Sequence, residues 1–176
     1  MAMPVIEMHQ PPSTLAGFAA ILKASRKRPG AVTALAPVCL VRPVVTLSAS
    51  DIAAYARVCG FRADHGVPLL YPQMLTFPLA MAYFASAHCP WPALGTVHLA
   101  NRVRQHAALH AGDVLRVEMR PGDLQAHEKG QIFSLEFQIF KGAQLVWEAT
   151  QTLLRIGVPQ PAGKPYTSAL HNDQPL

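Results

Sequence analysis

The chain has 176 residues, of which 51% are hydrophobic and only 14% are charged, and its net charge is +5. This length gives room for one domain with a well-buried core, and a surface poor in charge favours a protein that covers part of its outside with a partner. No aromatic residues are interleaved with the basic cluster Lys23, Arg26, Lys27 and Arg28, which argues against nucleic acid as that partner.

The N-terminal third of the chain predicts an arm, two helices and a strand. Met1–Ser13 has little periodicity and is predicted to be irregular. Thr14–Ser25 carries apolar residues at helical spacing and ends in the basic cluster. Pro37–Leu47 has apolar residues on both faces, as a covered strand does, although Pro43 favours an edge or a bulge. Ile52–Cys59 is predicted to be a short helix.

The basic cluster has two interpretations. Cations are favoured at the C-terminus of a helix, so the cluster is in the simpler case a solvated helix end. In the other case it attracts an acidic ligand, such as the phosphates of coenzyme A or an acidic carrier protein.

The middle of the chain predicts a buried helix. This segment is apolar nearly all round, which is typical of a helix inside the protein rather than on its surface. Pro78 is expected in the first turn or at a kink, because a proline deeper inside a helix costs about 3 kcal/mol. The residues that recur at helical intervals are Met74, Phe77, Met81, Phe84 and His88.

From Gly95 onward the pattern changes to strands and then to a tail. The predicted strands are Thr96–His106, Asp113–Arg120, Gln131–Lys141 and Ala143–Ile156. Gly157–Leu176 is polar, rich in proline and predicted to be flexible. A helix buried against a bent antiparallel sheet defines an α+β protein, and this order of elements is that of the hotdog fold. Residues 14–156 are therefore predicted to form one hotdog domain.

Three stretches resemble one family of proteins. Val67–Pro78, Gly95–Asn101 and Gln105–Asp113 are similar to the N-terminal hotdog of double-hotdog MaoC-like (3R)-hydroxyacyl dehydratases. The resemblance covers the chain from the first helix to Ile156. It implies a fatty-acyl thioester substrate, carried on coenzyme A or acyl carrier protein, and reversible addition of water to a 2-enoyl group.

The catalytic motif of that family is missing here. The family places an Asp and a His in a loop of the form G-D-x-N-P-x-H, where they act as general acid and base, and backbone amides at the start of the central helix stabilise the enolate-like oxygen. The corresponding segment, Cys59–Pro68, has Phe61 where the aspartate would stand, and Pro72-Gln73 replaces the usual His-Gly pair. The N-terminal half of double-hotdog enzymes also lacks the catalytic pair and supplies the pocket for the acyl chain.

Three residues are candidates for a displaced catalytic group: Asp64, His65 and His98. Asp64 and His65 are adjacent, which is not the family spacing, and we favour a polar surface loop there. His98 and Asn101 lie three apart on a predicted strand, so they are expected to point to opposite faces. No His or Cys has companions at metal-ligand spacing, so neither a metal nor a cofactor is expected.

The predicted substrate-binding residues belong to the buried helix and the strand that follows. In the simpler interpretation these residues only form part of the protein core. In the functional interpretation they form an adaptable wall for an acyl chain, because methionine fills irregular space at low strain. They are Tyr71, Gln73, Met74, Phe77, Met81, His98 and Asn101.

Three functions follow from these observations. The first is the acyl-binding, non-catalytic half of a heteromeric enoyl hydratase or 3-hydroxyacyl dehydratase, paired with a catalytic hotdog subunit. The second is a homodimeric hydratase or acyl-CoA thioesterase that uses non-standard residues. The third is a binding protein for acyl-CoA or carrier protein without turnover.

The cysteines and an apolar segment near the N-terminus bear on the cellular location. Cys39, Cys59 and Cys89 are widely spaced, odd in number and set among apolar residues, which predicts buried free thiols in a reducing cytoplasm. The apolar piece Leu15–Leu22 is too short to span a bilayer and is followed by basic residues, so neither a membrane span nor a signal peptide is expected.

Overall fold

The computed structural model describes residues 3–27, 30–62, 64, 66–158 and 165–167. Within them the elements follow in the order β1 (Val5–Glu7), α1 (Thr14–Ala24), β2 (Cys39–Thr46), α2 (Ala49–Cys59), α3 (Pro72–Ala85), β3 (Thr96–Gln105), β4 (Val114–His127), β5 (Gly130–Lys141) and β6 (Gln144–Ile156). The strands form one six-stranded sheet in the order β1-β2-β4-β5-β6-β3. Only the short β1 pairs in parallel; the other pairings are antiparallel.

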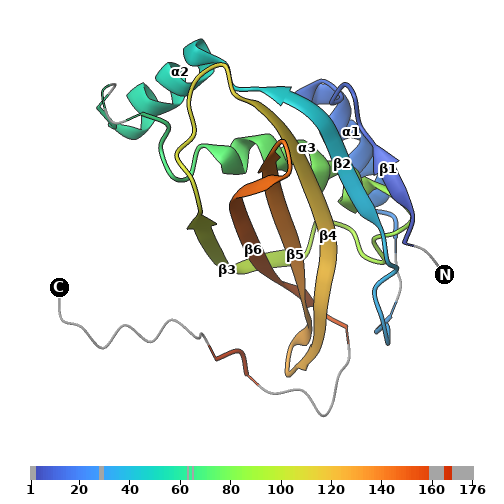
Figure 1. The fold of residues 1–176 in the computed structure, drawn as a ribbon. Coiled ribbons are helices and arrows are strands. Elements are labelled where there is room, and N and C mark those ends of the chain that lie inside the picture. The colour runs from blue at the N-terminus through green and yellow to red at the C-terminus, as the bar shows by residue number, and fades with distance from the viewer. Residues whose placement is uncertain (1–2, 28–29, 63, 65, 159–164, 168–176) are drawn as a thin grey trace.

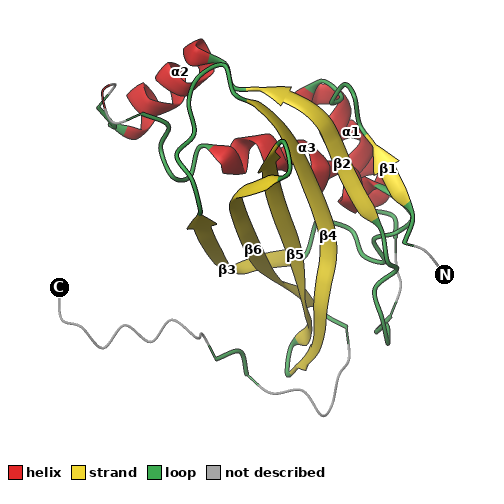
Figure 2. Cartoon of the chain, viewed as in Figure 1, coloured by secondary structure: helices red, strands yellow, loops and turns green. Residues whose placement is uncertain are grey.

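The sheet curls around α3, which confirms the α+β architecture predicted from the sequence (Figure 1). The helix contacts β2 and β4 on the sheet side and α1 on the other side. Figure 2 shows α2 set apart from α1. The central helix is thus covered by strands and by α1 on two sides. Met74 and Phe77 are nevertheless 56% and 49% exposed, so the burial that its nearly uniform apolar composition predicts is only partly found.

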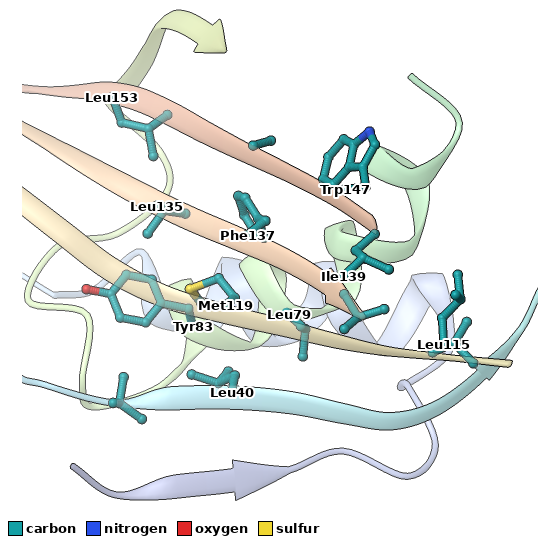
Figure 3. Close-up of a cluster of buried hydrophobic side chains, with 14 of the residues drawn as sticks. Leu40, Leu79, Tyr83, Leu115, Met119, Leu135, Phe137, Ile139, Trp147 and Leu153 are labelled. Atoms are coloured by element: carbon teal, nitrogen blue, oxygen red, sulfur yellow. The ribbon is translucent and has the colours of Figure 1, made fainter. Parts of the chain in front are cut away.

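The core lies between α3 and the concave face of the sheet (Figure 3). Leu79 and Tyr83 on α3 are fully buried against the sheet. On β5, alternate residues enter this core as predicted, because successive side chains of a strand point to opposite faces. They are Phe133, Leu135, Phe137 and Ile139, each at most 1% exposed.

Prolines interrupt the elements at three places. Pro78 was expected in the first turn or at a kink; it lies inside α3, beyond the first turn, so the carbonyl of Met74 lacks the amide that would normally bond to it. Pro43 was predicted to favour an edge or a bulge, and the register of β2 against β4 indeed shifts between Arg42 and Val45. A second shift follows Pro121 and lets β4 continue to His127, past its predicted end.

Several sequence predictions need correction. Residues Val5–Glu7 of the predicted irregular arm pair with β2 as a strand, because Cys39 donates its amide to Pro4 and the two segments align. His88 lies beyond α3, which ends at the cap residue Ser86. Cys59 is exposed, unlike the buried Cys39 and Cys89, because it is the last residue of α2 and lies at the end of the helix, beyond the buried Ile52 and Ala56.

Most of the predicted tail, 157–176, falls outside the described residues, but Val158 is buried in the core at 3% exposure. Among the described helices, none has the length and apolar character that crossing a membrane requires.

Candidate functional site

A cavity of about 610 Å³ lies between α1, α3 and the β3–β6 end of the sheet. This volume falls within the range of pockets that hold small molecules. Its wall is mostly apolar, and its polar groups come from the start of α3 and from β3 and β6. The lining residues are Phe18, Ile21, Gln73, Met74, Thr76, Phe77, Ala80, Met81, Phe84, Ala93, Leu94, His98, Asn101 and Gln151.

Helix α1 closes one side of the cavity by approaching α3 at Gly17. A Cβ atom on this residue would stand 2.9 Å from Cε of Met81, which is closer than real Cβ contacts. The glycine therefore allows α1 to lie directly on α3. This approach brings Phe18 and Ile21 to the cavity.

A β-bulge in β3 brings His98 and Asn101 to the same cavity. The register of β3 against β6 shifts between His98 and Ala100, so the extra residue reverses the alternation of faces. Both side chains consequently line the cavity. The expectation that they point to opposite faces is therefore wrong, because it assumed an undistorted strand.

A chain of hydrogen bonds connects the polar groups of the cavity. Asn101 donates from Nδ2 to Oε1 of Gln73 (3.2 Å), and Gln73 donates from Nε2 to the hydroxyl of Thr76 (2.7 Å). The Thr76 hydroxyl in turn donates to the backbone carbonyl of Gln73 (2.8 Å). The Oδ1 atom of Asn101 is buried and accepts no hydrogen bond from the described residues.

We expect Asn101→Leu to leave the free energy of unfolding unchanged or to raise it by up to about 1 kcal/mol. The substitution removes a buried acceptor that has no partner, and such groups are unfavourable; the half-buried Gln73 can then turn its amide toward solvent. Urea denaturation measures the change. Ser134→Ala is the control, because its buried hydroxyl does accept a bond, from the amide of Asp123 at 2.8 Å, and its loss costs about 1 kcal/mol. A loss for Asn101→Leu as large as that of the control would contradict the expectation.

His98 is the one histidine among the lining residues of the cavity, and histidine is the side chain that most often acts as a general acid or base. Its Nε2 lies 2.9 Å from the backbone carbonyl of Ala100. A carbonyl can only accept, so Nε2 carries the proton and Nδ1 is the acceptor of the neutral ring. No carboxylate lines the cavity with it.

Asp64, the second candidate, is an exposed ion-pair residue. Arg62 donates to both of its carboxylate oxygens, at 3.0 and 2.6 Å, and these bonds lower the pKa of Asp64. Asp64 does not line the cavity. The third candidate, His65, lies outside the described residues.

The amides at the start of α3 are already engaged. Pro72 has no N–H to offer, the amide of Gln73 donates to the carbonyl of Leu70 (3.1 Å), and that of Met74 donates to Tyr71 (2.9 Å). The preceding turn therefore uses the donors that a helix N-terminus ordinarily presents to an anion.

Six of the seven predicted substrate-binding residues line the cavity. The exception is Tyr71, which is 5% exposed and packs edge-on against Tyr55 in the core. Whether the six bind a substrate stays a prediction. Sequence reasoning missed Phe18 and Ile21 from α1 and Gln151 from β6; the glycine in the middle of α1 was the one signal of a close approach.

The described residues contain no group of three or more His, Cys, Asp or Glu side chains able to hold a metal ion. The phenol of Tyr83 and the thiol of Cys89 are also not candidates for chemistry, because burial raises the pKa of both.

Comparison with known proteins gives a consistent group of similar proteins, although no family model matches the chain. The chain is 31% identical over 116 residues to 3-hydroxyacyl-thioester dehydratase X of Mycobacterium tuberculosis, covering 66% of this chain and 41% of that protein. It is 29% identical to the crystallised HtdX of the same organism, with a TM-score of 0.62, covering 70% of this chain and 53% of that one. The chain thus spans about half the length of the relatives that it matches.

More distant structures share the fold. A MaoC-like dehydratase from Phytophthora capsici superposes with a TM-score of 0.62 at 17% identity, covering 76% of this chain and 52% of that one. The HadBC (3R)-hydroxyacyl-ACP dehydratase complex of Mycobacterium tuberculosis superposes with a TM-score of 0.59 at 19% identity, covering 69% of this chain and 98% of the matched one.

Proposed function

We propose that this chain, a member of the MaoC-like hotdog hydratase family, is the acyl-binding, non-catalytic half of an enoyl-thioester hydratase or 3-hydroxyacyl-thioester dehydratase. A second hotdog subunit supplies the general acid and base. The cavity between α1 and α3 receives the acyl chain in this proposal.

The observation that carries the proposal is an apolar cavity without catalytic partners. Hydration of a 2-enoyl group needs one group to deprotonate water and another to protonate the α-carbon. The cavity offers His98 without a carboxylate, and Asp64 is held by Arg62 at the surface. The Gln73 and Met74 amides at the start of α3, which would stabilise an enolate-like oxygen, are bonded to carbonyls.

The wall of the cavity suits an alkyl chain. Met74, Phe77 and Met81 supply flexible and aromatic apolar surface, and methionine adapts to ligands of irregular shape. The burial of each methylene contributes about 0.8 kcal/mol, so a chain of several carbons is held without any polar contact. The polar chain from Asn101 to Thr76 marks one end of the cavity, at the start of α3.

The test is an assay of the purified chain alone and together with a candidate catalytic hotdog subunit. We expect the lone chain to bind a long-chain 2-enoyl-coenzyme A without hydrating it, and hydration to appear when a subunit with the G-D-x-N-P-x-H motif is added. Binding is followed by calorimetry and hydration by loss of the enoyl absorbance. Full hydration by the lone chain would overturn the proposal.

One observation favours a second candidate, a hydratase that uses relocated residues: the bulge in β3 turns His98 toward the cavity. If the lone chain is active, Ala replacement of Asp64, His65 and His98 decides the matter. Loss of turnover in His98→Ala alone would assign the base to that residue, whereas unchanged turnover in all three variants would exclude them.

A further inference from the structure

Two amide side chains stand on the core side of the sheet, at its β3 end. Asn101 of β3 lies opposite Gln151 of β6, and Gln151 lies opposite the core residue Leu135 of β5. Both amides line the cavity. Residues directly opposite each other are close enough for their side chains to contact the same group. In an otherwise apolar pocket, such polar groups fix the orientation of a ligand and provide specificity.

The hydrogen bonds of Thr76 determine which atom of Asn101 is free. A hydroxyl has one proton to donate, and the Thr76 hydroxyl donates it to the backbone carbonyl of Gln73 at 2.8 Å. It must therefore accept from the side chain of Gln73, so Nε2 of Gln73 faces Thr76 and Oε1 faces Asn101. Asn101 presents Nδ2 to this oxygen. The atom of Asn101 that remains is Oδ1, an acceptor.

This Oδ1 atom is buried, and none of the described residues donates to it. Buried polar atoms of native proteins nearly always have a partner, and an acceptor without one is unfavourable. An unsubstituted acyl chain has no donor to offer. A hydroxyl group on the ligand suits the position, because it can donate to Oδ1 of Asn101 and accept from the amide of Gln151 at the same time.

We propose that Asn101 is a specificity-determining residue for acyl thioesters that carry a hydroxyl group on the chain beyond the reacting carbons. The inference rests on the proposed function, in which the reacting carbons lie at the acid and base of the second subunit. The cavity of this chain then holds the more distant carbons, so the hydroxyl that reaches Asn101 is not the one that hydration adds. An unsubstituted chain leaves the acceptor unpaired and is disfavoured for that reason.

The experiment is a calorimetric titration of the purified chain with coenzyme A thioesters of one chain length. Lauroyl-coenzyme A is compared with lauroyl thioesters that carry a single hydroxyl, placed at successive carbons from the middle of the chain to its end. We expect one position of the hydroxyl to strengthen binding about tenfold, the effect of one hydrogen bond to an otherwise unpaired buried acceptor. A hydroxyl elsewhere meets the apolar wall and should weaken binding.

Two variants test whether Asn101 causes this preference. Asn101→Leu removes the acceptor, so the unsubstituted thioester should bind at least as tightly as the best hydroxylated one. Thr76→Val has a similar shape but cannot accept a hydrogen bond, so the amides of Gln73 and Asn101 can turn, and the preference should shrink. Ser134→Ala is the control, because it removes a buried hydroxyl that does not line the cavity, and it should keep the tenfold preference.

Two results would overturn the inference. One is that no hydroxylated thioester binds more tightly than lauroyl-coenzyme A, as expected if a water molecule satisfies Asn101. The other is that Asn101→Leu keeps the preference of the wild type. Neither result alters the binding and hydration expected of the lone chain, whereas a complete absence of thioester binding would overturn the proposed function together with the inference. The two failures are therefore distinguishable.

Discussion

Ala80→Phe is expected to weaken the binding of a long-chain acyl thioester by about a hundredfold. Ala80 lines the cavity from the middle of α3, between Phe77 and Phe84. A ring at this position fills space that the acyl chain would occupy. Exclusion of three or four methylenes at about 0.8 kcal/mol each removes about 3 kcal/mol of binding free energy, which corresponds to this factor.

Chain length makes the measurement specific. Calorimetric titration of the variant with a long-chain thioester should show the full loss, whereas a four-carbon thioester that stays near the mouth should bind as it does to the wild type. Ala54→Phe is the control, because Ala54 is exposed on α2 and does not line the cavity. An equal loss for both ligands would indicate a general disturbance of α3, and no loss for either would place the acyl chain elsewhere.

The architecture could be predicted from the sequence because its signals are local. Alternation of Phe133, Leu135, Phe137 and Ile139 fixes one face of β5 without knowledge of any other strand. The apolar residues of α3 likewise identify a buried helix on their own. These elements and their order were enough to predict a sheet wrapped around a helix.

The cavity could not be predicted in the same way, because two features of it depend on pairing. The faces of His98 and Asn101 are set by the bulge in β3, and no residue of this strand signals a bulge as a proline or glycine would. Helix α1 packs on α3, where Gly17 leaves room for the end of the Met81 side chain. Periodicity finds a helix but does not say which element it packs against.

The absence of the family's catalytic motif was visible in the sequence. In the loop Cys59–Pro68, Phe61 stands where the family's aspartate would be, and Asp64 and His65 are adjacent and not at the family spacing, so no structure is needed to see that the motif is missing. The engagement of the helix amides is different in kind. It depends on the carbonyls of Leu70 and Tyr71 in the turn before α3, whose directions are set by the folded backbone and not by any local sequence pattern.

Gly130→Ala is expected to lower the free energy of unfolding by about 3 kcal/mol, the upper part of the range for forced overpacking. Gly130 begins β5 after the two-residue turn at Glu128 and Lys129, and it lies opposite Ile156 of β6. A Cβ atom there would stand 1.8 Å from the backbone carbonyl oxygen of Arg155. No side-chain rotation relieves such a contact, so β5 and β6 must move apart at this end.

Gly130→Ala should also disturb the cavity, because β6 carries the lining residue Gln151 and pairs with the whole length of β3. Urea denaturation measures the stability, and titration with a long-chain thioester measures the binding, which should also weaken. Gly30→Ala is the matched control, since nothing lies within 4 Å of a Cβ at that position, and it should change both quantities little. A stability loss below about 1 kcal/mol for Gly130→Ala would mean that the β5–β6 pairing yields at its end, and that the sheet is not the rigid support of the cavity.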